Sequence, residues 1–173
     1  TRRIGGESLP PKVPDGVEVS DRELAKPTSL LGAMKVVGSI GAMRYGLLGA
    51  VEDDMEFLAD DGARYYQDGS DYAAARVLIE GKSGKGAYRS VGLLSTITEH
   101  SEADSQAHAV DYHFLSKEGE WKIDGQLLYS STHEDSDGFG GFVDVSKNLR
   151  YGSQIDLGIA HYDDRLDIND LGY

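Results

Sequence analysis

The sequence has no cysteine among its 173 residues, which excludes disulfide frameworks, Cys-x-x-Cys redox motifs and cysteine-ligated zinc sites. It is also poor in basic residues, because 17 Lys and Arg stand against 30 Asp and Glu and give a formal charge of −13. A nucleic-acid binder carries a basic footprint, so we expect no nucleic-acid partner. No apolar run approaches the roughly 18–20 residues that a transmembrane helix needs.

Proline is scarce and is confined to the beginning of the chain. All four prolines, at positions 10, 11, 14 and 27, lie within residues 1–29, which also contain Gly5-Gly6 and Asp15-Gly16. Proline removes a backbone donor and is disfavoured in helix interiors and central strands. Residues 1–29 are therefore predicted to form a Pro/Gly-rich extended loop, and residues 30–173 to form antiparallel β-strands.

Eight segments of about ten residues alternate between apolar and polar side chains. In one of them, Trp121, Ile123 and Leu127 share one face, while Lys122 and Asp124 share the other. Period two is the pattern of a pleated strand between two different environments. The predicted strands span about 30–39, 42–52, 73–82, 87–98, 106–116, 120–131, 139–148 and 151–162.

Short and longer connections alternate along these segments. Only Ile40-Gly41 separates the first two strands, and Lys117-Glu118-Gly119 joins another pair, whereas residues 53–72 form a long acidic link. A meander with one set of turns at each end would have one tight end and one looped end. The predicted fold is all-β, an antiparallel up-and-down meander of about eight strands that forms part or all of a transmembrane β-barrel.

The position of the charges favours a membrane barrel. Outer-membrane barrels have strands of about ten residues, an apolar outward face, a polar lumen, short turns at one end and longer loops at the other. A Lys or Arg on the lipid face would cost about 2–4 kcal/mol at mid-depth, and the strand charges follow the non-apolar phase, apart from Arg89 at the end of its strand. The residues predicted to line the lumen are Lys35, Arg44, Arg76, Glu80, Asp111, Lys122, Asp124, Asp144 and Asp156.

A soluble barrel or sandwich that binds a small ligand or glycan is the alternative. There the apolar face points inward, and alternation alone does not distinguish the two arrangements. Strand length, turn asymmetry and the small residues on the apolar face favour the membrane. Aromatic side chains also lie near both ends of that face, as in interfacial belts: Trp121, Tyr151 and Phe114 at the tight end, and Tyr129, Phe139 and His161 at the looped end.

Several stretches resemble a large, functionally uncharacterised bacterial family. They are residues 1–5 (TRRIG), 13–16 (VPDG) and 31–35 (LGAMK), and most specifically residues 162–173 (YDDRLDINDLGY). Members of that family carry an amino-terminal carbohydrate-binding module of the family-nine type, followed by an outer-membrane β-barrel domain of unknown function. The resemblance implies that this chain is an internal part of a larger barrel that lacks the module. It supplies no catalytic residues.

One acidic cluster is a candidate calcium site, because Ca²⁺ takes six to eight oxygen ligands. The cluster lacks the order of an EF-hand, and a solvated loop with Asx turns is the favoured interpretation, with calcium as the alternative. Its residues are Asp163, Asp164, Asp167, Asn169 and Asp170. No other metal and no cofactor is predicted.

No enzyme chemistry is predicted, since the chain has no Gly-x-Ser-x-Gly motif and its Gly-rich segments do not match a phosphate-binding loop. We expect a protein of the bacterial outer membrane, in contact with the lipid bilayer or lipopolysaccharide. Its expected role is passage or surface binding of a solute, linked to saccharide use through the module that the resemblance implies. The sequence identifies no protein partner.

Overall fold

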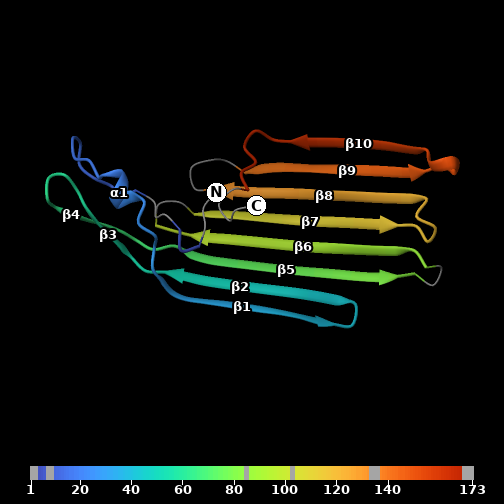
Figure 1. Cartoon of the computed structure of the whole chain (residues 1–173), viewed down its shortest axis with the longest axis horizontal. Coiled ribbons are helices and arrows are strands. Elements are labelled where there is room, and N and C mark those ends of the chain that lie inside the picture. The colour runs from blue at the N-terminus through green and yellow to red at the C-terminus, as the bar shows by residue number, and fades with distance from the viewer. Residues whose placement is uncertain (1–3, 7–9, 84–85, 102–103, 133–136, 169–173) are drawn as a thin grey trace.

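An eight-stranded antiparallel sheet forms most of the molecule (Figure 1). The computed structural model describes residues 4–6, 10–83, 86–101, 104–132 and 137–168. The strands of the main sheet are β1 (Leu30–Ile40), β2 (Met43–Glu52), β5 (Asp71–Lys82), β6 (Tyr88–Glu99), β7 (Ser105–Leu115), β8 (Trp121–Thr132), β9 (Gly138–Asn148) and β10 (Gln154–Tyr162).

Each strand of this sheet pairs antiparallel with its neighbours in the order β1-β2-β5-β6-β7-β8-β9-β10. The predicted all-β, up-and-down meander of about eight strands is confirmed, and seven of the eight predicted starts lie within two residues of those observed. The sheet is open within the described residues, because β1 and β10 each have a partner on one side only. The two outer edges therefore present unpaired backbone groups.

Tight turns occupy one end of the sheet. Gly41, Gly86 and Gly119 adopt positive φ values of 60°, 83° and 69° in three of them, which glycine accepts without the steric cost of a Cβ. The fourth turn corrects the prediction that the last strand starts at residue 151. Tyr151 lies in a 3₁₀ turn (Arg150–Gly152) with φ 66°, is fully exposed, and does not belong to the aromatic row of the sheet.

The opposite, looped end contains a small second sheet that the sequence analysis missed. β3 (Met55–Leu58) and β4 (Arg64–Gln67) form an antiparallel hairpin inside the link between β2 and β5. The prediction that residues 1–29 contain no helix is also wrong by one turn, since α1 (Asp21–Leu24) forms there. In the described part of the chain, no helix is long and apolar enough to cross a membrane.

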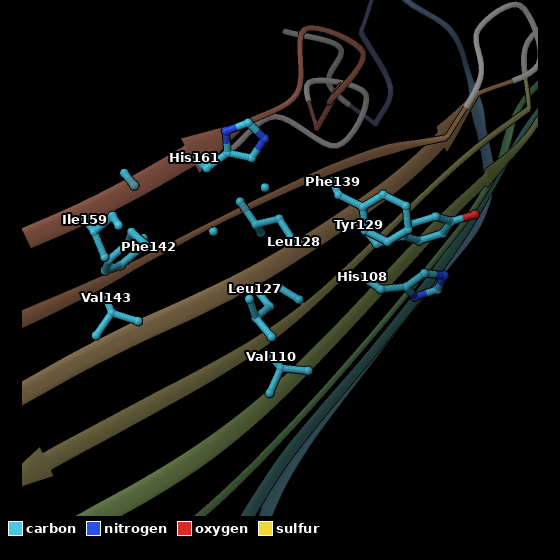
Figure 2. Close-up of a pocket in the computed structure, with 14 residues that line it drawn as sticks. His108, Val110, Leu127, Leu128, Tyr129, Phe139, Phe142, Val143, Ile159 and His161 are labelled. Carbon is cyan, nitrogen blue, oxygen red and sulfur yellow. The ribbon is translucent and has the colours of Figure 1, made fainter.

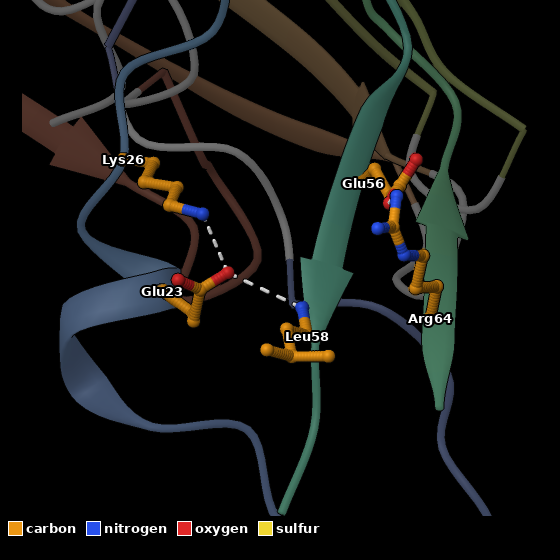
Figure 3. Close-up of polar contacts among 5 residues, drawn as sticks. All are labelled: Glu23, Lys26, Glu56, Leu58 and Arg64. Atoms are coloured by element: carbon orange, nitrogen blue, oxygen red, sulfur yellow. Dashed lines mark hydrogen bonds and ion pairs between the residues drawn. The ribbon is translucent and has the colours of Figure 1, made fainter. Parts of the chain in front are cut away.

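The segment before β1 packs against this hairpin, and together residues 10–29 and 55–67 form what we call the loop-end cap. Val19 and Ala59 form an antiparallel bridge, and the Leu58 amide donates a 3.2 Å hydrogen bond to the Glu23 carboxylate (Figure 3). Lys26 Nζ lies 2.6 Å from the same carboxylate. Glu23 therefore joins α1 to β3.

We expect this junction to loosen in acid. The Lys26 ammonium and the Leu58 amide lower the pKa of Glu23 below its ordinary value of 4.5. Because the pKa of Glu23 is lower in the folded state, its contacts stabilise the cap at every pH above the pKa that this carboxyl has in the unfolded chain. That stabilisation is lost as the pH falls through the folded-state pKa. Carbon-detected NMR titration of the Glu23 carboxyl should show the lowered pKa, and Glu23→Gln should speed hydrogen exchange of the Leu58 amide. Titration at the ordinary value would contradict the prediction.

The apolar core is small and lies at the looped end. Phe57 of β3 is completely buried. The side chain of Gln67, the last residue of β4, lies 2.9 Å from the His100 ring. The His100 ring also lies 2.9 Å from the Asp68 carbonyl oxygen. Most large apolar side chains of the main sheet are not part of such a core. Leu127, Leu157 and others on the same face are strongly exposed.

Candidate functional site

The nine charged residues predicted to share one face of the sheet do share it. Lys122 and Asp124 lie on the side of β8 opposite Ile123 and Leu127, and Asp124 pairs directly with Asp144 of β9. The registers of the other strand pairs extend this face from β1 to β10. We call it the charged face. Whether it lines a lumen stays a prediction.

The charged face carries a network of polar contacts that crosses five strands. Arg44 of β2 pairs with Glu80 of β5 at 2.5 Å, and the Tyr88 hydroxyl of β6 donates a 2.8 Å hydrogen bond to the same carboxylate. The His113 ring of β7 meets the Tyr88 ring edge to face at 5.6 Å. These contacts connect the side chains of β2, β5, β6 and β7 across the face.

The network continues into β8 through a shared carboxylate. Asp124 contacts the Nδ1 atom of His113 and lies 2.6 Å from Lys122 Nζ. The three side chains remain partly exposed, so water reaches them. The Asp124 carboxylate therefore joins β8 to β7 through His113 and also pairs with Lys122 on its own strand.

A second ion pair crosses β6 above a glycine. Arg76 of β5 and Asp111 of β7 are separated by 3.1 Å, although β6 lies between their strands. Gly92 makes this possible, because a Cβ at that position would lie 2.4 Å from both carboxylate oxygens of Asp111. Arg76 and Glu80 lie four positions apart on β5, which is about 13 Å, and each pairs with a residue of another strand.

Gly92→Ala is expected to push the Asp111 carboxylate away and break its pair with Arg76. The pair is partly exposed, so we expect the free energy of unfolding to fall by no more than about 1 kcal/mol. NMR chemical shifts of the Arg76 guanidinium would report the lost contact directly. Gly81→Ala is the matched control, because nothing lies within 4 Å of its added Cβ. Unchanged Arg76 signals in Gly92→Ala would contradict the prediction.

Charge is distributed unevenly across the charged face. The cations Lys35, Arg44 and Arg76 lie on β1, β2 and β5. On β9 and β10, the charged residues of this face are the anions Asp144 and Asp156. Gln154 Nε2 donates a 2.6 Å hydrogen bond to Asp156, and the Asp144 carboxylate extends over Gly158 of the edge strand. The β10 side of the sheet is therefore locally acidic.

The opposite face is apolar and exposed. The exposed fractions of Leu127, Leu157 and Ile159 are 67%, 68% and 74%. Within the described residues no second layer covers this face. Small side chains on the charged face, such as Ser90 and Ala109, are by contrast nearly buried. This difference indicates that the sheet curves toward its charged face, which crowds that side and spreads the apolar side.

The apolar face has two grooves near the looped end. The first, of about 550 Å³, lies over β7–β10, and we call it the histidine groove. Figure 2 shows it between the aliphatic side chains Leu127, Val143 and Ile159, with His108, Tyr129 and His161 beside them. The second, of about 700 Å³, lies over β1, β2, β5 and β6, and its lining includes Asp71 and Glu99.

An aromatic row crosses the sheet at the edge of the histidine groove. The His108 and Tyr129 rings stack with centroids 5.9 Å apart, and Tyr129 meets Phe139 at 5.0 Å. At the tight end, Lys147 Nζ lies 4.6 Å from the Trp121 ring. The aromatic residues predicted near the two ends of the apolar face thus lie there, except Tyr151.

The predicted calcium ligands are only partly described. Arg165 binds the Asp163 carboxylate at 2.8 Å, and this pair holds the pKa of Asp163 well below its usual range while it raises the pKa of Arg165. Asn169 and Asp170 lie outside the described residues. Among the residues that are described, Asp164 and Asp167 included, no group of three acidic or histidine side chains is arranged to hold a metal.

The sequence analysis missed Tyr88, Gly92 and His113 as parts of the charged-face network. Tyr88 and His113 follow the same alternation as the nine charged residues, so the period itself could have identified them. Gly92 carries no such signal, since its role depends on two side chains that lie on other strands.

Comparison of the chain with protein-family models, with curated proteins and with solved structures finds no match. The resemblance described above therefore stays a prediction.

Proposed function

We propose that the sheet is a section of the wall of a bacterial outer-membrane β-barrel, with the apolar face toward lipid and the charged face toward an aqueous passage. One observation carries this proposal: most of the exposed large aliphatic side chains of the eight strands lie on one face, and nine charged side chains lie on the other, where a polar network joins five of the strands. Only helices and closed barrels satisfy every backbone group in a bilayer. Exposed aliphatic surface of this extent is costly in water.

The open edges fit a wall that further strands complete. In hydrocarbon, an unpaired backbone donor or acceptor costs several kcal/mol. Every described residue of β10 is exposed, and β1 has a partner only in β2. We infer that additional antiparallel strands pair with β1 and β10 in the membrane, as in the larger barrel that the resemblance implies.

The passage would take a polar solute, and we propose a saccharide as the class. Carboxylate, guanidinium, imidazole and phenol groups on the charged face can exchange hydrogen bonds with sugar hydroxyls. The partners at the outer side would be the lipid bilayer and lipopolysaccharide. No catalytic step is part of this proposal.

Spin labels at two adjacent positions test the orientation of the faces. The absence of cysteine makes each introduced thiol unique, so Leu127→Cys and Gln126→Cys can be labelled in lipid vesicles. Power-saturation EPR measures collision with oxygen, which concentrates in lipid, and with a water-soluble nickel chelate. We expect oxygen to relax the label at 127 and the nickel chelate to relax the label at 126.

Two other outcomes would overturn the proposal. A label at 127 that neither reagent reaches would place the apolar face in a dry protein interior, as in the soluble barrel or sandwich. A label at 127 that the nickel chelate reaches would place this face in water. Leu94→Cys on the charged face and Leu93→Cys on the apolar face repeat the comparison on β6, so the conclusion does not depend on one strand.

A further inference from the structure

The histidine groove differs from the rest of the apolar face because polar side chains stand beside it. His108, Tyr129 and His161 line the groove together with aliphatic residues, and Figure 2 shows the Tyr129 hydroxyl directed along the sheet, away from the aliphatic group. Within the described part of the chain, the polar atoms of these three side chains make no hydrogen bond. They are available to a ligand.

The floor of the groove is formed by a glycine. Gly141 lies between Leu127 of β8 and His161 of β10 in the register of the sheet. Gly141 has no side chain of its own, and a methyl group of Leu127 lies 3.0 Å from where its Cβ would be, while Val143 and Ile159 line the groove toward the tight end. From Phe139 to Val143 the strand covers about 14 Å. That length matches a stretch of about eleven methylene groups.

We propose that the histidine groove binds one phospholipid, with an acyl chain along β9 between Phe139 and Val143 and the phosphate beside the stacked pair His108 and Tyr129. This inference rests on the proposed function, because it takes the apolar face to be in a bilayer. Imidazole N–H and phenol O–H groups donate hydrogen bonds, and a phosphate supplies acceptor oxygens for them. An aliphatic groove with donors at one end is thus complementary to an amphiphile with an anionic head group.

The second groove on the same face supports this assignment by contrast. It is equally apolar in its walls, but Asp71 and Glu99 lie at its edge and pair directly in the register of β5 and β6. Two carboxylates repel a phosphate. The two grooves therefore give one chain both a candidate site and an internal control.

Native mass spectrometry of the detergent-solubilised chain tests the proposal with dioleoyl phosphatidylglycerol as the probe. We expect one retained lipid per chain, and we expect dioleoylglycerol, which has the same chains and no phosphate, not to be retained. His108→Phe keeps the ring stacked on Tyr129 and removes the imidazole donor, so lipid affinity should fall about tenfold. His108→Gln keeps a donor and should retain most of the affinity.

His113→Phe is the matched control, since it removes an imidazole from the opposite face of the same strand and should leave lipid retention unchanged. Equal retention of the lipid by all variants, or equal retention of dioleoylglycerol, would overturn the proposal. An orientation opposite to that expected from the spin labels would instead overturn the proposed function. Labels in the expected orientation together with equal lipid retention would remove only the lipid site.

A measurement on the unaltered chain keeps the proposal testable if the variants fail to fold. Phosphatidylglycerol with a diazirine in its acyl chain can be photo-crosslinked to the protein in vesicles, and the modified peptides can be mapped. We expect residues 139–143 and 155–161 to be modified several-fold more than residues 47–51 of the acidic groove. Equal modification of the two regions would mean nonspecific lipid contact and would overturn the site.

Discussion

Leu127→Arg is expected to lower the free energy of unfolding from a bilayer by about 2–4 kcal/mol, the cost of an arginine on the lipid face near the middle of a barrel strand. Leu127 lies in the interior of β8 with two-thirds of its surface exposed. In the proposed orientation this surface contacts acyl chains. The new guanidinium would lose its hydration there without gaining a partner.

Gln126→Arg is the matched control, since it places the same side chain one residue away on the charged face. Gln126 pairs with Asp111 in the register of β7 and β8, so the added charge has an acidic neighbour and water. We expect a change within about 0.5 kcal/mol. Urea titration of the folded chain in vesicles measures both values, and equal losses for the two variants would contradict the assignment of the faces.

The second large effect is expected at the floor of the histidine groove. Gly141→Ala would place a Cβ 2.6 Å from the carbonyl oxygen of Gln126 and 3.0 Å from a methyl carbon of Leu127. The carbonyl belongs to the paired backbone of β8 and cannot move aside as a side-chain end would. We expect a loss of about 1–3 kcal/mol in the free energy of unfolding.

Gly81→Ala makes the same change on the same face of β5, where nothing lies within 4 Å of the new Cβ. It should be neutral or stabilise by about 0.4–1 kcal/mol, because alanine reduces the freedom of the unfolded chain. Thermal or urea unfolding of the two variants under the same conditions measures the difference. Equal stability of Gly141→Ala and Gly81→Ala would show that β8 and β9 are not packed as closely as described.

The alternation of the sequence predicted the sheet and its faces because a strand has a fixed period of two. Once Leu127 is placed on one side of β8, Asp124 must lie on the other, whatever the neighbouring strands do. Turn residues such as Gly41 and Gly119 predicted where the chain reverses. These signals are local in the sequence. They were sufficient to predict the strand order because consecutive strands of the main sheet are neighbours in it.

The missed features depend on contacts between distant residues. β3 and β4 are only four residues long each, too short for a period to be recognised among the aspartates of that link, and their hairpin packs against the segment before β1. The partner of Arg76 could not be read from the sequence either. It reaches Asp111, 35 positions away, because Gly92 leaves the space between them open.

The tight turns have a consequence for how the chain acquires its structure. At four positions, consecutive strands of the main sheet are joined by links of only two to five residues, so bringing each such pair together costs little chain entropy. The four hairpins β1–β2, β5–β6, β7–β8 and β9–β10 are thus natural early units of assembly. Joining them across the longer links is then the slower, entropically more demanding stage, and lengthening those links should delay it while leaving hairpin formation unaffected.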